Sequence, residues 1–303
     1  CHAYYIIQAN PCVPQENDKD GKGEIKKPST LLPGLTRLAI GLLCMVGYLN
    51  FSPRFPLPSL YKAAFIASTP FHKRECHLLV AMLGERFKYY FAWKVAEGAS
   101  ILGGFGFEGY EVKKSDDGKE KYVAKGWAGV ENIDIIAFET AYNSSLASRA
   151  WNKRTQGWLE RYTYFRSGKS LYATYFVSAV WHGLYPGFFF VFFSIAIITE
   201  VERLVRVKLN PLLVPNWGGR PSDPFPGTPV AYAYWGLSWV CFVLSLNYAA
   251  QVFCMGSLEW SLSAYGGSLW FGHVGMVAVY VLMLLLPGGK KDKKDKADKG
   301  KKE

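Results

Sequence analysis

The chain has 303 residues, of which 50% are hydrophobic and 16% aromatic, and its formal net charge at pH 7 is +11. Several uncharged runs reach the roughly 20 residues that a helix needs to cross a bilayer, which excludes an ordinary soluble protein. These runs lack the two-residue alternation of barrel strands, so we expect a helical membrane protein. The positive charge lies in loops and near the C-terminus, where it suits anionic headgroups and phosphorylated ligands rather than nucleic acid.

The chain begins with Cys1 and shows no signal-peptide pattern, so we expect a fragment that lacks the N-terminal portion of its protein. The six cysteines form neither a CxxC pair nor a zinc-ligand spacing, and we expect neither a metal site nor a disulfide framework.

Residues 14–30 are charged and rich in Gly and Pro, and they are predicted to form a polar loop. The first predicted span contains the uncharged run 38–53, which Arg37 and Arg54 flank. The shorter apolar segment 57–71 is typical of an interfacial or re-entrant piece.

Residues 77–103 have a helical pattern that nevertheless contains charged side chains. These are Glu85, Arg86, Lys88, Lys94 and Glu97. Such charges favour a helix with one face toward protein or a water-filled cavity, and a surface-lying amphipathic helix is the alternative. The GxGxxG string at 104–109 has no strand before it and no helix directly after it, so it indicates a glycine-rich turn rather than a dinucleotide site. A polar loop is expected over 111–131.

The central stretch, residues 151–199, begins with a basic and aromatic segment. Its second part, 171–199, has 29 residues without Lys, Arg, Asp or Glu, and His182 is its only side chain that can be charged at neutral pH. Its length is enough to span a bilayer. A histidine in such a run is either functional or hydrogen-bonded inside a helix bundle.

Residues 200–223 are predicted to be a polar connection, and 225–258 and 260–287 each supply a span. His273 in the last span is interpreted as structural. The tail 290–303 has eight lysines against four acidic residues, which predicts a disordered cytosolic tail. Its end is similar to a lysine-based endoplasmic reticulum retrieval signal.

The strings Trp151-Asn152 and Ser178 to Gly187, SAVWHGLYPG, resemble the membrane-bound O-acyltransferase family. The segments FKYYFAWKVAEGASILGGFGF and GVENIDIIAFETAYN are similar to its lysophospholipid acyltransferase branch, known from fungi and plants. The resemblance implies an all-α, polytopic transmembrane bundle. It implies one catalytic membrane domain over 1–289, followed by the tail, in a multi-pass protein of the endoplasmic reticulum.

The reaction that this resemblance implies is transfer of a fatty acyl group from acyl-CoA to the free hydroxyl of a lysophospholipid. Acyl-CoA is a co-substrate, and neither a cofactor nor a metal is expected. An alcohol needs a base to attack a thioester, and a desolvated histidine stays neutral and accepts the proton. We therefore expect His182 to be the general base and Asn152 to support it as a hydrogen-bond donor.

Further residues of the two motifs are candidates for substrate binding. They are Trp151, Lys153, Arg154, Trp158, Arg161, Ser178, Trp181 and Tyr185. The basic side chains are suited to the phosphates of CoA, but anchoring of an interfacial helix to headgroups explains them equally well. Ser178 shares a helical face with His182, but without a GxSxG elbow or an acidic partner it is better explained by packing than as a nucleophile.

Two other classes of function stay open at the sequence level. One is acylation of another alcohol, such as a sterol, a diacylglycerol or a protein serine, and the other is a non-catalytic, lipid-binding membrane protein.

On a straight helix Asn152 and His182 would lie about 45 Å apart, so joint action requires a turn, for which Gly168 and Gly183 provide places. A straight span through His182 would also place the basic segment 153–169 in the lumen, against the positive-inside rule. Either the His182 segment re-enters the membrane, or the spans are miscounted. The sequence carries no signal for headgroup preference, acyl-chain preference or oligomeric state.

Overall fold

The computed structural model describes residues 28–114, 120–214, 217 and 226–286. Most of the loop at 14–30 and the whole tail at 290–303 lie outside these residues. The described chain is mainly helical, so the all-α prediction is confirmed. It divides into two compact units, which are described separately. Unit 1 comprises 1–56, 80–138 and 148–158, and unit 2 comprises 57–79, 139–147 and 159–303. The single domain expected over 1–289 stays a prediction.

Unit 1 is built on α2 (Leu31–Arg54) and the part of α4 (Phe71–Leu102) that begins at Val80. Glycines let the two backbones approach closely, as small residues do between membrane helices. A Cβ at Gly34 would lie 2.7 Å from the Leu102 side chain, and one at Gly98 would lie 2.8 Å from the carbonyl oxygen of Gly34. Gly34 of α2 thus lies against Leu102, whereas Gly47, further along α2, lies against Phe87, so the two helices are antiparallel.

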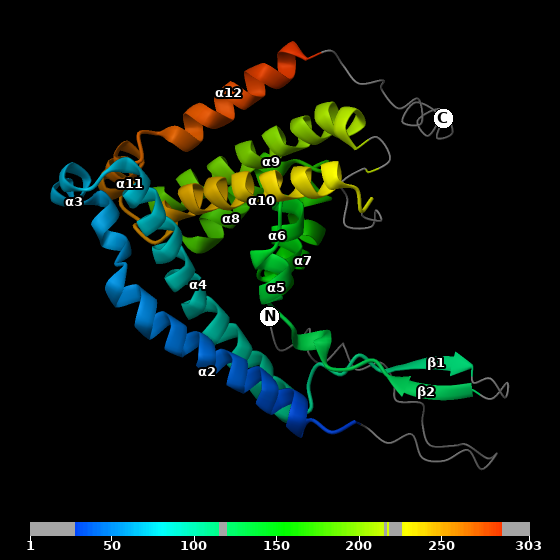
Figure 1. The fold of residues 1–303 in the computed structure, drawn as a ribbon. Helices are drawn as coiled ribbons and strands as arrows, with labels where there is room; N and C mark the ends of the chain where they lie inside the picture. The colour runs from blue at the N-terminus through cyan, green and yellow to red at the C-terminus, as the bar shows by residue number, and fades with distance from the viewer. Residues whose placement is uncertain (1–27, 115–119, 215–216, 218–225, 287–303) are drawn as a thin grey trace. The chain divides into compact units, whose positions relative to one another are not determined.

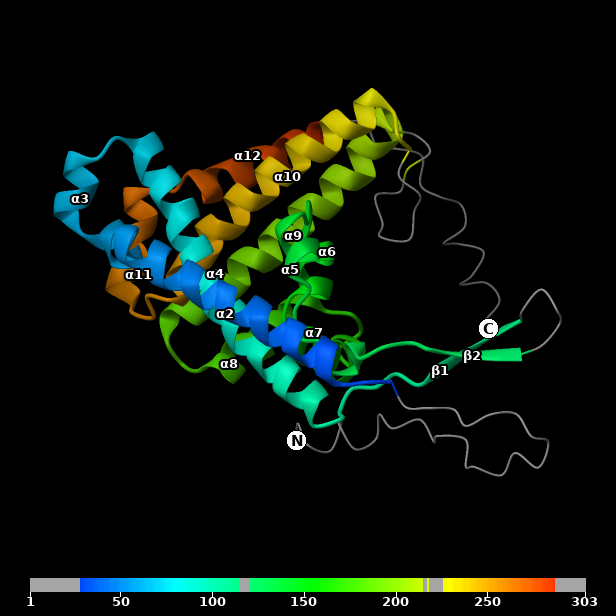
Figure 2. The same ribbon diagram turned by 60° about the horizontal axis from the view of Figure 1, so that its bottom comes forward.

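A glycine-rich turn follows α4, as predicted, and Gly104, Gly106 and Gly109 have positive φ angles. The chain then forms an antiparallel hairpin of β1 (Tyr110–Lys114) and β2 (Glu120–Ala124), in which Tyr110 is opposite Ala124 (Figure 2). The expectation of a polar loop over 111–131 was therefore wrong for these strands. The strands were missed because their charged side chains do not show the apolar alternation by which a strand is recognised. The hairpin is held by backbone pairing rather than by burial of one face.

Short helices follow the hairpin and extend into the central stretch. They are η2 (Ala128–Val130), α5 (Ile135–Glu139), α6 (Ser144–Ala150) and α7 (Lys153–Leu159). The core of unit 1 contains Cys44 of α2, Tyr90 of α4 and Ile133, which lies directly before α5.

Unit 2 is organised around α9 (Pro186–Leu213), which runs beside α10 (Pro229–Ala250) and α12 (Phe271–Leu285) in both views (Figures 1 and 2). Its remaining elements are η1 (Leu57–Tyr61), α3 (Ala63–Ser68), the π-helical turn η3 (Glu160–Tyr164), α8 (Leu171–His182), η4 (Gln251–Phe253) and α11 (Leu258–Gly267). The packing of α9, α10 and α12 buries a cluster made of Ile198, Val201, Ala249 and Met276.

Two helical segments of the described chain are long and apolar enough to cross a membrane, Leu31–Tyr61 and Pro229–Phe253. The pair α11 and α12 makes a third if it is one span bent by 69°. The uncharged run 171–199 does not form one straight helix, because the chain turns between α8 and α9. The run therefore does not form the straight span through His182 that conflicted with the positive-inside rule.

Candidate active site

The turn that follows His182 is made by the residues of the WHGLYPG string. His182 ends α8, and Gly183 adopts φ 133° and ψ 176°, a conformation that only glycine takes up readily. Pro186 is the first residue of α9, where its missing N–H costs nothing. Gly187 lies against the segment after α10: its N–H donates to the Gly256 carbonyl at 3.0 Å. A Cβ at Gly187 would lie 2.4 Å from the carbonyl oxygen of Val252, so this position also requires glycine.

The same close approach places His182 among aromatic rings. Phe192 of α9 stacks on the imidazole with 5.2 Å between ring centroids, and Phe253 of η4 meets it edge-on at 5.0 Å. Phe188 lies 5.8 Å away on the first turn of α9. The ring is half-buried, and among the described residues it has no hydrogen-bond partner. Within the described part of the chain, therefore, no protein group occupies its nitrogens.

His273 differs from His182 in this respect. Its Nδ1 lies 2.5 Å from the Tyr248 hydroxyl, and its Nε2 lies 3.4 Å from the Ser194 hydroxyl. The three side chains come from α12, α10 and α9, so this histidine links the helices that form the core of unit 2. The structural interpretation of His273 fits these contacts, since both ring nitrogens are occupied by protein.

The other candidates of unit 2 surround the same turn or precede it. Ser178 is buried on α8, and in the described structure no hydrogen bond joins it to His182, so these two residues do not form the serine–histidine pair of a nucleophilic mechanism. Trp181 and Tyr185 are exposed on either side of His182. Arg161 lies in η3. The roles of these residues in substrate binding stay predictions.

In unit 1, Asn152 lies in the short link between α6 and α7 and has φ 45°. Asparagine is one of the few residues that tolerate this left-handed conformation. The preceding Trp151 is anchored by rings on both sides: its centroid lies 4.6 Å from that of Phe138 and 4.9 Å from that of Trp93. The tryptophan thus holds the link in place, and its predicted contact with substrate is untested.

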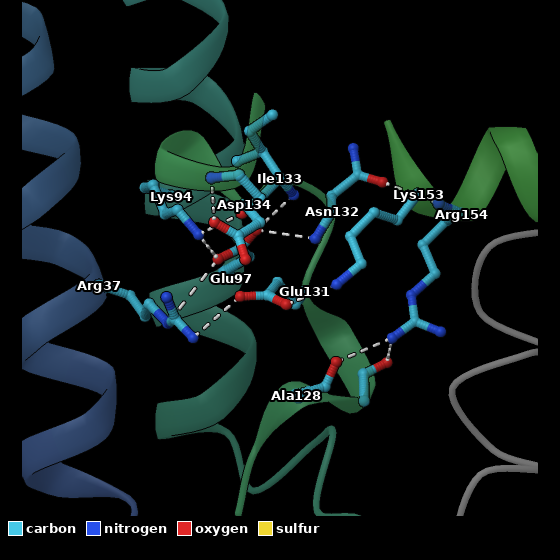
Figure 3. A network of polar contacts seen from close by, with 12 residues as sticks. Arg37, Lys94, Glu97, Ala128, Glu131, Asn132, Ile133, Asp134, Lys153 and Arg154 are labelled. Atoms are coloured by element: carbon cyan, nitrogen blue, oxygen red, sulfur yellow. Dashed lines mark hydrogen bonds and ion pairs between the residues drawn. The ribbon is translucent and has the colours of Figure 1, made fainter. Parts of the chain in front are cut away.

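A buried ionic network lies beside this link (Figure 3). The carboxylate of Glu97, on α4, accepts hydrogen bonds from Lys94 Nζ at 2.7 Å and from the N–H groups of Asn132 and Ile133 at 2.8 and 3.2 Å. Lys94 also donates to the Ile133 carbonyl at 2.6 Å. Because Lys94 and Glu97 are only 2% and 3% exposed, the prediction that charges of this helix face protein is confirmed for both residues.

A second carboxylate, Glu131, continues the network toward α7. It pairs with Lys153 at 2.6 Å and with Arg37 at 3.2 Å. The guanidinium of Arg154 donates to the carbonyl groups of Ala128 and Gly129. Lys153 and Arg154 are therefore engaged by protein in this structure, and their predicted contact with the phosphates of CoA remains untested.

The site residues expected from the sequence are divided between the units. Unit 1 contains Trp151, Asn152, Lys153, Arg154 and Trp158, and unit 2 contains Arg161, Ser178, Trp181, His182 and Tyr185. The sequence did not single out Glu131 and Asn132. Both belong to the GVENIDI segment, but nothing in its composition indicates that its backbone would bind a carboxylate 35 residues earlier in the chain.

Comparison with known proteins gives a consistent result. The family model described as "MBOAT, membrane-bound O-acyltransferase family" matches residues 2–225. The chain is 32% identical over 266 residues to a lysophospholipid acyltransferase of Schizosaccharomyces pombe, covering 85% of this chain and 48% of the relative. It is 29% identical to lysophospholipid acyltransferase 1 of Arabidopsis thaliana, with 86% of this chain and 54% of the relative covered. For human membrane-bound glycerophospholipid O-acyltransferase 1 the values are 26%, 89% and 50%. The chain thus spans about half the length of the curated relatives it matches.

Proposed function

The chain belongs to the membrane-bound O-acyltransferase family, and on that premise we propose that its protein transfers a fatty acyl group from acyl-CoA to the free hydroxyl of a lysophospholipid. The names of the fungal and plant relatives support this acceptor over a sterol, a diacylglycerol or a protein serine. The observation that carries the proposal is the half-buried imidazole of His182, which lies among aromatic rings at a helix break and has no hydrogen-bond partner among the described residues.

In the proposed reaction, a nitrogen of neutral His182 removes the proton from the acceptor hydroxyl. The oxygen attacks the thioester carbonyl, the new C–O bond forms, and the C–S bond breaks as the carbonyl is restored. The imidazolium then returns its proton to the departing thiolate of CoA, which leaves the histidine neutral again. The aromatic surroundings favour this cycle because they disfavour a permanent imidazolium while leaving a nitrogen accessible.

Asn152 is proposed to donate a hydrogen bond from its amide to the oxygen that becomes negative during the attack. A donor that is oriented in advance stabilises such an oxyanion without reorganisation, and loss of one donor lowers kcat by about 100- to 1,000-fold in comparable enzymes. The left-handed backbone of Asn152 and the anchored Trp151 support a fixed position for this amide. The endoplasmic reticulum membrane is the proposed location.

The test measures transfer of labelled oleoyl-CoA onto a panel of lysophospholipids, with a sterol and a diacylglycerol as competing acceptors. It uses microsomes that contain the native protein carrying this sequence. His182→Ala should abolish phospholipid formation, and Asn152→Ala should reduce it about 100-fold. His72→Ala is the matched control, because His72 is an exposed histidine at the start of α4. An active His182→Ala protein would disprove the general-base assignment, and transfer to the sterol or diacylglycerol alone would disprove the proposed acceptor.

A further inference from the structure

Asn132 makes hydrogen bonds with the Asn152 side chain and with the two residues that follow Asn152. The main-chain carbonyl of Asn132 accepts from the N–H of Lys153 at 2.8 Å, and its side-chain Oδ1 accepts from the N–H of Arg154 at 3.2 Å. Its side-chain Nδ2 donates to Oδ1 of Asn152 at 3.1 Å. One residue thus holds the two positions that follow Asn152 as well as the Asn152 side chain itself.

These contacts determine the direction in which both amides point. The N–H of Arg154 can only donate, so the atom of Asn132 that faces it must be the oxygen. The other end of the Asn132 amide is then the NH2 group, which can only donate, and the atom of Asn152 that faces it must be an oxygen. Because the Arg154 N–H is a backbone donor, it fixes the orientation of both amides although the O and N atoms of an amide are similar in size.

The consequence concerns the remaining end of the Asn152 amide. With its oxygen bound by Asn132, its Nδ2 is left without a partner among the described residues. A free NH2 group is a hydrogen-bond donor and never an acceptor. The orientation is therefore the one that a developing oxyanion requires, and the opposite orientation would present a carbonyl oxygen that repels it.

Asn132 is itself held in place from the helix behind it. Its N–H donates to the buried carboxylate of Glu97 at 2.8 Å, and the neighbouring N–H of Ile133 donates to the same carboxylate (Figure 3). Hydrogen bonds to an ionised acceptor are roughly twice as strong as those between neutral groups. The backbone at Asn132 is thus fixed on a regular helix, α4, which is a more rigid support than a loop.

We infer that Asn132 is a positioning residue: it holds the Asn152 amide in the orientation that leaves the Asn152 NH2 group available to the reacting oxygen. The inference rests on the proposed function, in which Asn152 stabilises the oxyanion. It assigns no contact with substrate to Asn132, which acts through Asn152 alone.

Two substitutions at one position test the inference. Asn132→Asp keeps the size of the side chain and the acceptor for Arg154, but it presents an oxygen to Asn152. The Asn152 amide must then rotate and donate its NH2 group to the new carboxylate, which withdraws the donor from the reaction. Asn132→Ala removes the hydrogen bond to the Asn152 oxygen but provides no acceptor for the Asn152 NH2 group. We expect kcat to fall about 100-fold in Asn132→Asp and by a smaller factor in Asn132→Ala. The KM values for acyl-CoA and lysophospholipid should stay within about twofold, because the interaction is made in the transition state.

The expected order is opposite to the one that a purely structural role predicts, in which the conservative Asn132→Asp change would be the milder of the two. Combination with Asn152→Ala gives the second readout: Asn132→Asp should cause no further loss of kcat in that background, because both changes remove the same donor. The assay uses the native protein in microsomes, and the melting temperature of each variant is measured in detergent.

The inference is overturned if Asn132→Ala is as impaired as Asn132→Asp, if the losses of Asn132→Asp and Asn152→Ala multiply, or if Asn152→Ala is fully active. Failure of the proposed function gives a different result, since the unchanged protein would then form no acylated lysophospholipid. In that case the same variants, measured with whichever alcohol the protein does acylate, still decide the inference.

Discussion

The Lys94–Glu97 ion pair is predicted to be the most sensitive point of unit 1, and Lys94→Met tests this prediction. Methionine keeps the length and helix propensity of lysine but removes its charge. Glu97 then loses its contact at 2.7 Å, and of its partners among the described residues it retains the N–H groups of Asn132 and Ile133 and the distant Arg37, whose Nε lies 3.9 Å from the carboxylate. The Ile133 carbonyl also loses its donor at 2.6 Å.

The size of the effect follows from burial. Removing one partner of a buried pair costs about 3–5 kcal/mol, because the other charge is left without compensation in a medium that solvates it poorly. The Lys94 and Glu97 side chains are 3% and 2% exposed, so this estimate applies to them. At roughly 2–4 °C per kcal/mol, the apparent melting temperature should fall by about 10 °C.

Lys88→Met is the matched control. Lys88 also lies on α4 and pairs with a glutamate three positions away, Glu85, but its side chain is 45% exposed. Exposed pairs contribute about 0–1 kcal/mol, so the control should melt within about 3 °C of the unchanged protein. The measurement is thermal unfolding of the purified protein in detergent, followed by intrinsic tryptophan fluorescence.

A second variant separates charge from packing. Glu97→Gln keeps an oxygen for the two N–H groups but removes the negative charge, so the double variant Lys94→Met/Glu97→Gln should melt at a higher temperature than Lys94→Met alone. The ion-pair explanation is wrong if Lys94→Met melts within about 3 °C of Lys88→Met, or if the second substitution lowers stability further.

Two more predictions concern unit 2. In Gly187→Ala, the new Cβ would lie 2.4 Å from the Val252 carbonyl oxygen and would displace η4, and with it Phe253, from His182. The rate of acyl transfer should therefore fall about 10- to 100-fold. Gly236→Ala is the control and should retain the activity, because a Cβ at Gly236 would meet nothing within 4 Å. Equal activity of the two variants contradicts this explanation. Burial raises the pKa of Glu202 from 4.5 to about 7, against the hydrogen bond from the Ser144 N–H. Between pH 4.5 and about 7, the Glu202 carboxyl is therefore protonated in the folded protein and ionised in the unfolded chain. The free energy of unfolding consequently decreases by about 3 kcal/mol as the pH rises from 4.5 to about 7. Glu202→Gln should melt higher than the unchanged protein at pH 8 and lack this decline; the same pH profile in both proteins would rule the cause out.

Local chemistry allowed several features to be predicted from the sequence. Uncharged runs predicted membrane helices, and the residues after His182 indicated a place where a helix bends. Glycine with a positive φ angle and proline at a helix start act through their own backbones, so a reader of the sequence needs no knowledge of distant neighbours to interpret them. The left-handed conformation of Asn152 was not predicted in this way, because asparagine tolerates that conformation but does not require it.

The helical class of this protein, its candidate spans and the turn beside His182 could thus be predicted, because they depend on uncharged runs and on backbone preferences within a few residues. Two long-range pairings became visible only in the folded chain: Gly187 contacts Val252, 65 positions later, and Glu97 binds the backbone of Asn132. Such pairings arise because a buried carboxylate needs hydrogen-bond donors, and a closely packed carbonyl needs a neighbour without a Cβ. Both are supplied by segments that are distant in the sequence. No local pattern in the sequence indicates which distant segments will pair. The orientation of the Asn152 amide depends on one such pairing, that of Asn132 with residues 152–154.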